Sequence, residues 1–421
     1  MPISASFCKE SGVVQHRVSI DGSHILATVP ANGSGQQEVS TEFLRGALAH
    51  PVKYHASERQ RRVTYVDLFC GGGGLSLGIE QGLRFLGYSP RMIAAVDKDS
   101  VALSLVKRRF DPLVPRACSV DDLYSAQLTF REGHEGFVTG PTISDAELAP
   151  FAGKVDLVVG GPPCQGHSNL NNHTRRRDQR NLLYFSMISC AIALRPRLII
   201  IENVPSILSS SENVVEVGKA LLRNSEFHVS DFVLNAAHYG VAQRRQRHFL
   251  VASKAELPGL EQELNALALP QVSVNDVIGD LPDLSYDEDL LESNPNLSAQ
   301  NVERIRYLFE NGEYELPNDR RPECHQKDHT YPAVYGRLKG DIPSPTITTG
   351  FTSPGRGRFI HPSERRTINA REAARIQSFP DWYWEGIGEL GFRRANLAKV
   401  IGDAVPPRLA MNVILACASA L

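Results

Sequence analysis

The segment RVTYVDLFCGGGGLSLGIEQGLRFLG, residues 62–87, decides the fold. Its first part is a compact apolar run that stops at four consecutive glycines. Its second part has the three- and four-residue apolar spacing of a helix, and it ends at a glycine. A buried strand, a glycine-rich turn and a helix are therefore predicted to follow one another.

The same alternation of strand and helix continues downstream. Strands are predicted in MIAAVDKD, KVDLVVGG and PRLIIIENV, and helices in SVALSLVKRRF, NLLYFSMISCAIALR and VVEVGKALLRN. The predicted strands are continuously apolar, which is typical of strands buried on both faces. We therefore predict an α/β fold with a mostly parallel sheet and helices on both of its faces.

Four regions of the chain differ in composition and in their pattern of predicted strands and helices. Residues 1–60 form an N-terminal extension, in which VVQHRVSI and HILATV are predicted to pair as a hairpin across DGSH. Residues 61–254 carry the alternating pattern. Residues 255–360, rich in Asn, Pro, Asp and Glu with a helix at AQNVERIRYLFENG, read as a smaller inserted domain. Residues 361–421 return to the first domain through the helix NAREAARIQSF and a long apolar helix behind PP.

Composition limits the class of protein. The 421 residues are 42% hydrophobic and 22% charged, as in ordinary globular chains, and the net charge of -2 leaves nucleic-acid binding to local patches. Seven scattered cysteines without a C-x-x-C pair argue against a disulfide framework or a structural zinc site. With no apolar run of about 18 residues and no signal-peptide pattern, we expect a cytoplasmic protein without a membrane span.

Polar and glycine residues follow the first two predicted strands. The carboxyl ends of parallel strands are where α/β sheets bind ligands. FCGGGG follows the first strand, and its glycines allow close approach of a ligand to the backbone. Asp97 follows the second strand at the distance that suits a ribose diol. Taken alone, the glycines are equally well explained by a tight turn, and Asp97 by a solvated acid. Together the two features predict a nucleoside-bearing cofactor.

Cys164 and Glu202 follow the next two strands. A single loop and helix separate them, so the two strands are expected to be neighbours. The two prolines before Cys164 favour a nucleophile over a small buried hydrophobe, and the apolar LIII run before Glu202 favours a partly buried, protonated carboxyl over a helix cap. A thiolate and a protonated carboxyl suit addition to carbon 6 of cytosine, which makes carbon 5 nucleophilic toward a sulfonium methyl group.

At this point the chain resembles the cytosine-5 DNA methyltransferase family, which uses S-adenosyl-L-methionine (SAM). The matching segments, in the family's order from Val66 to about Leu409, are DLFCGGGGLSLG, AAVDKD, DLVVGGPPCQGHS, RNLLYF, IIIENV, QRRQRHFLVA, REAARIQSFPD and IGDAVPP. The resemblance implies the Rossmann-like fold of SAM-dependent methyltransferases, with residues 255–360 as the target-recognition domain. It also implies methyl transfer to carbon 5 of a flipped cytosine in duplex DNA through a covalent Cys164 adduct, with S-adenosyl-L-homocysteine as product and no metal.

The resemblance also implies roles for individual residues. Cys164 matches the nucleophile, Glu202 the acid at ring nitrogen 3, and Arg245 and Arg247 the two arginines near the base and its backbone, although a surface basic cluster would look similar. Asn203 would brace the catalytic rim, the edge of the sheet that carries Cys164 and Glu202. The residues implied around SAM are Phe69, Gly71, Gly73, Gly74, Asp97, Lys98, Val120, Pro162, Leu183, Asp403, Ala404 and Val405.

Two positions depart from the family pattern. The family's acid that contacts adenine falls at Ser119, which leaves Val120 and Asp121 as the candidates there. Asp403 stands where the family usually has Asn, so its backbone is expected to serve.

The predicted DNA contacts lie in two segments. The polar loop after the nucleophile carries four arginines and would close over DNA, and two glycine-flanked arginines at the end of the inserted domain could enter a groove. Solvated surface loops are the alternative for both. The predicted contacts are Gln165, Ser168, Arg175, Arg176, Arg177, Arg180, Arg356 and Arg358.

Other functions remain open from the sequence. A branch of the same family methylates tRNA, and a DNA-binding regulator could keep the fold without catalysis. A nicotinamide-dependent oxidoreductase would explain the glycines but leaves PCQ, ENV and QRRQR unexplained. Chains of this size resemble bacterial enzymes that protect host DNA in restriction-modification or other phage-defence systems. The expected setting is therefore a monomer at the nucleoid, with duplex DNA and other proteins of a defence system as partners.

Overall fold

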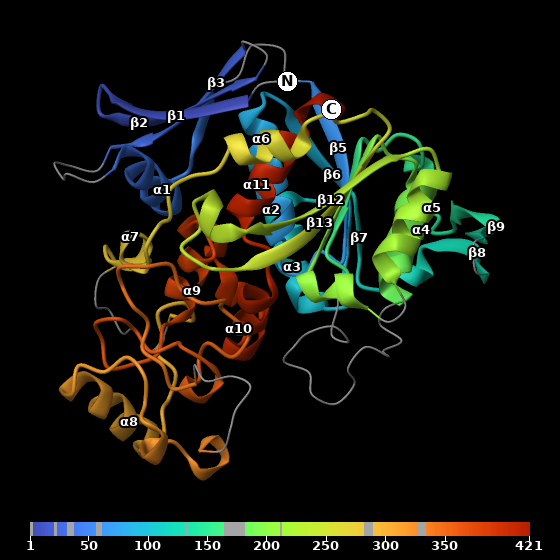
Figure 1. Ribbon diagram of the computed structural model, residues 1–421. Helices are drawn as coiled ribbons and strands as arrows, with labels where there is room; N and C mark the ends of the chain where they lie inside the picture. Colours follow the sequence, from blue (N-terminus) through green and yellow to red (C-terminus); the bar gives the residue numbers. More distant parts are fainter. Residues whose placement is uncertain are drawn as a thin grey trace.

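The computed structural model describes residues 3–20, 23–31, 38–55, 61–131, 134–163, 182–210, 213–281, 289–326 and 334–421. Figure 1 shows a larger body built around one sheet and a smaller lobe that contains α8. Both chain ends lie at the same side of the larger body (Figure 1).

The central sheet has seven strands in the order β12–β13–β11–β10–β5–β6–β7. β13 runs antiparallel to both of its neighbours, and the pairings from β11 to β7 are all parallel. The prediction of a mostly parallel sheet is therefore confirmed. The strands are β5 (Arg62–Leu68), β6 (Ser89–Val96), β7 (Val114–Arg116), β10 (Leu157–Gly160), β11 (Leu198–Asn203), β12 (His228–Asn235) and β13 (Gln246–Ser253).

Helices cover both faces of this sheet, as the continuously apolar strands require. Alternate residues of each central strand enter two separate hydrophobic cores. α2 (Gly74–Phe85), α3 (Ser100–Phe110) and α11 (Pro407–Ala416) pack on one face, while α4 (Leu182–Leu194) and α5 (Val214–Asn224) pack on the other. The predicted helices 100–110 and 214–224 match α3 and α5 to the residue.

The first helix of the larger body packs directly on the last. A Cβ on Gly78 would clash with the Pro407 carbonyl oxygen, and one on Gly82 would clash with Ile414. α2 and α11 therefore lie closer together than side chains would allow. α11 spans ten residues, so it is shorter than the long helix predicted behind PP. The Arg61 guanidinium donates to the Leu421 carbonyl oxygen over 2.7 Å, which joins the two ends of this body.

The residues before Arg61 form an N-terminal module, defined here as the described part of residues 3–55. It contains a four-stranded antiparallel sheet, β1–β2–β3–β4, and one helix. The predicted hairpin is confirmed, because β2 pairs with β3 between Ile20 and Ser23. The module packs into the same core as α2 and α11. Its elements are β1 (Ile3–Glu10), β2 (Val13–Ile20), β3 (Ser23–Pro30), α1 (Val39–Ala49) and β4 (Lys53–His55).

A second hairpin and a smaller lobe complete the fold. β8 (Tyr124–Arg131) and β9 (His134–Ile143) form a hairpin beside α4 that the sequence did not predict. α8 (Ala299–Glu310) anchors a separate hydrophobic cluster that includes Leu316 and Ile360. The remaining helices, which pack on the larger body, are α6 (Leu260–Ala266), α7 (Val274–Ile278), α9 (Ala370–Ile376) and α10 (Arg394–Asp403). Across the described ranges, no helix is both long and apolar enough to cross a membrane.

Candidate active site

Three neighbouring strands bring the predicted site residues to one edge of the sheet. Gly160, the last residue of β10, pairs with Leu68 of β5 on one side and with Ile201 of β11 on the other. The glycine loop after β5, the Pro162 segment after β10 and Glu202 at the end of β11 therefore meet at this edge. The prediction that the strands before Cys164 and Glu202 are neighbours is confirmed.

Glu202 is a buried carboxylate paired with Arg247. The distance from Arg247 Nε to Glu202 Oε1 is 2.7 Å, and both side chains are about nine-tenths buried. The second oxygen of Glu202 faces the chain that leads to the predicted nucleophile, because a Cβ on Gly161 would lie 3.1 Å from Oε2. Burial raises the pKa of the Glu202 carboxyl, and the charges of Arg247 and Arg245 offset part of that rise. The carboxyl is thus placed to hold a proton.

Asn203 ties β11 to the segment after β10. Its side-chain nitrogen donates to the Pro162 carbonyl oxygen over 3.2 Å, and its side-chain oxygen accepts from the Val204 amide. The predicted brace at this rim is confirmed, and it fixes the backbone two residues before position 164. Cys164 itself lies outside the described residues, as do the predicted DNA contacts Gln165, Ser168, Arg175, Arg176, Arg177 and Arg180.

Arg245 lies at the same rim but points into the protein. Only 2% of the residue is exposed, and its two terminal nitrogens donate to the Ile347 and Gly402 carbonyl oxygens over 2.8 and 3.0 Å. The guanidinium of Arg245, which was predicted near the base and its backbone, is bonded here to carbonyl groups of two distant segments. Arg245 thus joins the exit of the inserted region to the IGDAVPP segment behind the site.

The glycine loop divides into an open part and a packed part. Gly71 has φ +50°, and a Cβ on it would meet no described atom within 4 Å. Gly73 and Gly74 are packed instead, since a Cβ on Gly73 would lie 2.6 Å from Tyr383 Oη and one on Gly74 would lie 2.5 Å from the Val405 carbonyl oxygen. Phe69 is also held at a positive φ of 62°. The open face at Gly71 suits close approach of a ligand.

Asp97 supports this loop from the end of β6. One oxygen of its carboxylate accepts from the Gly71 amide and the other from the Asp99 amide, each over 2.8 Å. Each carboxylate oxygen has further lone pairs, so Asp97 can still accept from a hydroxyl group. Lys98 is exposed, and Asp99 caps α3.

The remaining residues predicted around the cofactor surround the same edge. Val120 and Pro162 are buried, and Leu183 is half-buried in the first turn of α4. Asp121 is bonded to the hydroxyl groups of Ser186 and Ser119. In the IGDAVPP segment Asp403 is exposed and pairs with Lys399, while Ala404 and Val405 lie against Gly74.

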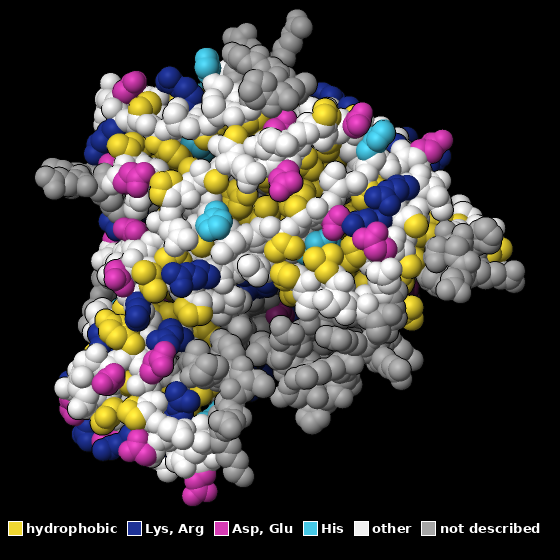
Figure 2. Space-filling view, viewed as in Figure 1, with side chains coloured by type: hydrophobic (Ala, Val, Ile, Leu, Met, Phe, Trp, Pro, Cys, Tyr) yellow, Lys and Arg dark blue, Asp and Glu magenta, His cyan; other side chains and the backbone are white. Residues whose placement is uncertain are grey.

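The two arginines predicted to read DNA have different environments. Arg356 is exposed. Arg358 is 13% exposed and donates to the Tyr314 and Arg337 carbonyl oxygens and to the Glu315 carboxylate. Arg358 therefore holds the smaller lobe together, which differs from the predicted entry into a groove. Lys, Arg, Asp and Glu side chains are interspersed over the face of the molecule in Figure 2, in line with the near-neutral net charge.

Two residues that support the glycine loop were not predicted. Tyr383 is fully buried, and its hydroxyl donates to the Gly72 carbonyl oxygen over 2.7 Å. Asp67 in β5 accepts from the Ser76 hydroxyl over 2.5 Å, and burial raises its pKa to about 7. The signals available in the sequence were the aromatic run DWYW and an acid inside an apolar strand.

Comparisons with known proteins cover most of the chain. The family described as C-5 cytosine-specific DNA methylase matches residues 63–419, so the N-terminal module lies outside the match. Type II methyltransferase M1.BsuMI of Bacillus subtilis (strain 168) is 39% identical over 355 residues, which are 84% of this chain and 80% of that protein. Type II methylase M.HgiDII of Herpetosiphon aurantiacus is 30% identical over 358 residues, covering 82% and 92%.

Solved structures share the fold. The crystal structure of S. pombe Dnmt2 methyltransferase aligns with a TM-score of 0.55 at 16% identity, covering 84% of this chain and 98% of that one. The Entamoeba histolytica methyltransferase EhMeth aligns with a TM-score of 0.54 at 15% identity, covering 85% and 98%.

Proposed function

The chain belongs to the C-5 cytosine-specific DNA methylase family, and from this premise we propose that it transfers a methyl group from SAM to carbon 5 of a flipped cytosine in duplex DNA. The observation that carries the proposal is the buried Glu202–Arg247 pair. It lies against Gly161, three residues before Cys164, and on the same sheet edge as the glycine loop.

The described cysteines support Cys164 as the nucleophile. Burial raises the pKa of the Cys70, Cys190 and Cys417 thiols, and a buried protonated thiol is a poor nucleophile. Cys8 lies in the N-terminal module and Cys118 on the β7 side of the sheet, away from Glu202.

In the proposed reaction the Cys164 thiolate adds to carbon 6 of cytosine while the Glu202 carboxyl gives its proton to ring nitrogen 3. Arg247 binds the carbonyl at ring position 2 and stabilises the charge that develops there. Carbon 5 then carries the electron pair that accepts the methyl group. Loss of the carbon 5 proton to solvent and return of the nitrogen 3 proton to Glu202 expel the thiolate and restore the ring double bond.

The residues of the glycine loop fit the cofactor. SAM, when bound, supplies the electrophilic methyl group and leaves as S-adenosyl-L-homocysteine. The open face at Gly71 would take its backbone contacts, Asp97 a ribose hydroxyl, and Phe69 and Leu183 the apolar walls. No step of the proposal requires a metal.

We further propose that the modification protects the cell's own DNA in a restriction-modification or other phage-defence system, because the relatives are named type II enzymes. The protein would act on nucleoid DNA in the cytoplasm as a monomer, alone or with other proteins of such a system. The inserted region with exposed Arg356 favours duplex DNA over tRNA.

A trapping assay tests the reaction. The protein is mixed with SAM and either duplex DNA containing 5-fluorocytosine or tRNA containing the same base. Fluorine cannot leave as a cation, so a denaturation-resistant adduct should form with DNA. It should be absent in Cys164→Ser and retained in Cys118→Ser. An adduct only with tRNA would establish the alternative substrate, and an adduct that survives Cys164→Ser would refute the nucleophile.

A further inference from the structure

A buried arginine without a counterion lies where the N-terminal module meets the larger body. Arg408, in the first turn of α11, is 9% exposed. Its guanidinium makes no hydrogen bond or ion pair to any described residue, and its Nε is buried without a partner. The two other buried arginines of the described chain, Arg245 and Arg375, are bonded through their side chains.

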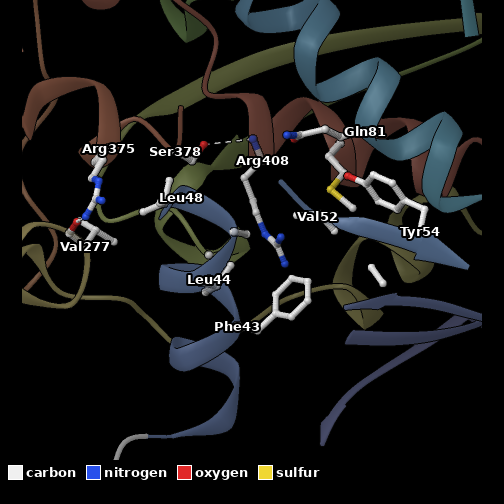
Figure 3. A pocket seen from close by; sticks show the side chains of 14 residues that line it. Phe43, Leu44, Leu48, Val52, Tyr54, Gln81, Val277, Arg375, Ser378 and Arg408 are labelled. Atoms are coloured by element: carbon white, nitrogen blue, oxygen red, sulfur yellow. Dashed lines mark hydrogen bonds between the residues drawn. The ribbon is translucent and has the colours of Figure 1, made fainter. Parts of the chain in front are cut away.

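The guanidinium faces a small cavity, shown in Figure 3. The cavity has a volume of about 30 Å³, and its lining residues come from the N-terminal module and from several elements of the larger body. Phe43, Leu44 and Leu48 of α1 supply the apolar wall. Arg408 extends toward Phe43, with its central carbon 5.7 Å from the ring centroid. Tyr54 of β4 and Gln81 of α2 belong to the remaining walls.

No described carboxylate pairs with the positive charge, and the face of the Phe43 ring offsets it only in part. Burial lowers the pKa of Arg408 to about 10, and the only described group that raises it is Tyr54, which is neutral at pH 7. A water molecule could accept from Nε, but the charge would remain unpaired. Removing an unpaired charge from water is strongly unfavourable. A cavity needs about 10–15 Å³ to hold one water molecule, so this one has room for a single small ion.

We propose that this cavity binds one small monovalent anion of chloride size, held by the Arg408 guanidinium with the Tyr54 hydroxyl and the Gln81 amide as further donors. The apolar wall from α1 excludes larger hydrated anions. Because Phe43, Leu44, Leu48 and Tyr54 belong to the N-terminal module, bound anion and docked module stabilise each other. The site lies on the α2–α11 face, apart from the Glu202 edge, and it does not depend on the proposed function.

Thermal and urea unfolding in matched sodium chloride and sodium gluconate test this site. Chloride at about 20 times its dissociation constant should raise the ratio of folded to unfolded protein about 20-fold over gluconate. Arg408→Met, which keeps the aliphatic length without the charge, should lose this difference. Arg223→Met, at an exposed position of α5, should keep it. Equal stability of the native protein in both salts, or a chloride effect retained by Arg408→Met, would overturn the proposal.

A second measurement uses the unaltered protein, in case Arg408→Met fails to fold. Crystals grown with bromide should show an anomalous peak within hydrogen-bonding distance of the Arg408 guanidinium. A carboxylate of this chain in that position, or a cavity that contains only water, would rule out the anion site.

Discussion

Replacing Arg247 by Gln should destabilise the protein in a strongly pH-dependent way. The Arg247–Glu202 contact of 2.7 Å would contribute about 6 kcal/mol at an effective dielectric constant of about 20, before the desolvation of both groups is subtracted. Without Arg247, Glu202 is a buried carboxylate with one less neighbouring cation, so its pKa, already raised by burial, rises further.

Proton uptake by Glu202 limits the loss of stability. Protonating a carboxyl with an ordinary pKa of 4.5 at pH 7 costs about 1.36 × 2.5, or about 3.4 kcal/mol, and at pH 5.5 about 1.4 kcal/mol. The sign follows from linkage: the native protein retains a proton that the unfolded chain releases, so stability falls as pH rises above 4.5. We therefore expect a loss of at most about 3 kcal/mol at pH 7 and at most about 1 kcal/mol at pH 5.5, because burial already raises the pKa of Glu202 in the native protein.

Urea unfolding followed by circular dichroism at the two pH values measures this difference. Glu202→Gln in the Arg247→Gln background should remove most of the pH dependence. The double variant should also be more stable than the sum of the two single losses by at least about 1 kcal/mol. Arg244→Gln, at the exposed neighbouring position, should change little. A loss that is the same at both pH values, or additive single variants, would refute the role of the buried pair.

Three further outcomes follow from the site. Asn203→Ala should lower turnover about tenfold with a much smaller fall in SAM affinity, because the lost bond to Pro162 loosens the nucleophile segment; an equal fall in SAM affinity would contradict this. Gly71→Ala and its control Gly12→Ala, both at positive φ with open space, should each lose about 1 kcal/mol, but only Gly71→Ala should weaken SAM binding in a titration. Asp67→Asn should flatten the pH profile of stability between about pH 4 and 8. The reason is that native Asp67, with its pKa raised to about 7, keeps a proton that the unfolded chain loses. Parallel pH profiles of the two proteins would argue against this.

The central fold was predictable because local pattern and tertiary burial agree there. β5, α2, β6 and α3 follow the apolar runs and glycine stops of the sequence, and Asp99 caps α3 as a helix start requires. The β8–β9 hairpin was missed because its strands are partly exposed and lack a continuous apolar run. α6 and α7 lie in the polar stretch after residue 255 but pack on the larger body.

The sequence predicted which residues lie at the edge of the sheet, but not which atoms they contact. Strand order follows from the chain, so the meeting of the Cys164 and Glu202 strands could be inferred. The orientation of an arginine side chain could not be inferred, since Arg245 and Arg358 are bonded to carbonyl groups from segments distant in sequence. Tyr383 reaches Gly72 across more than 300 residues of chain, and no local pattern records that contact.

The close contact between α2 and α11 has a consequence for synthesis. α2, which follows the glycine loop, is synthesised more than 300 residues before its partner α11. Until α11 is made, the glycine face of α2 has no opposing surface, so an apolar surface stays exposed while the intervening residues are synthesised. A chain truncated before α11 would therefore be expected to aggregate or to require a chaperone, even though it contains every predicted catalytic residue.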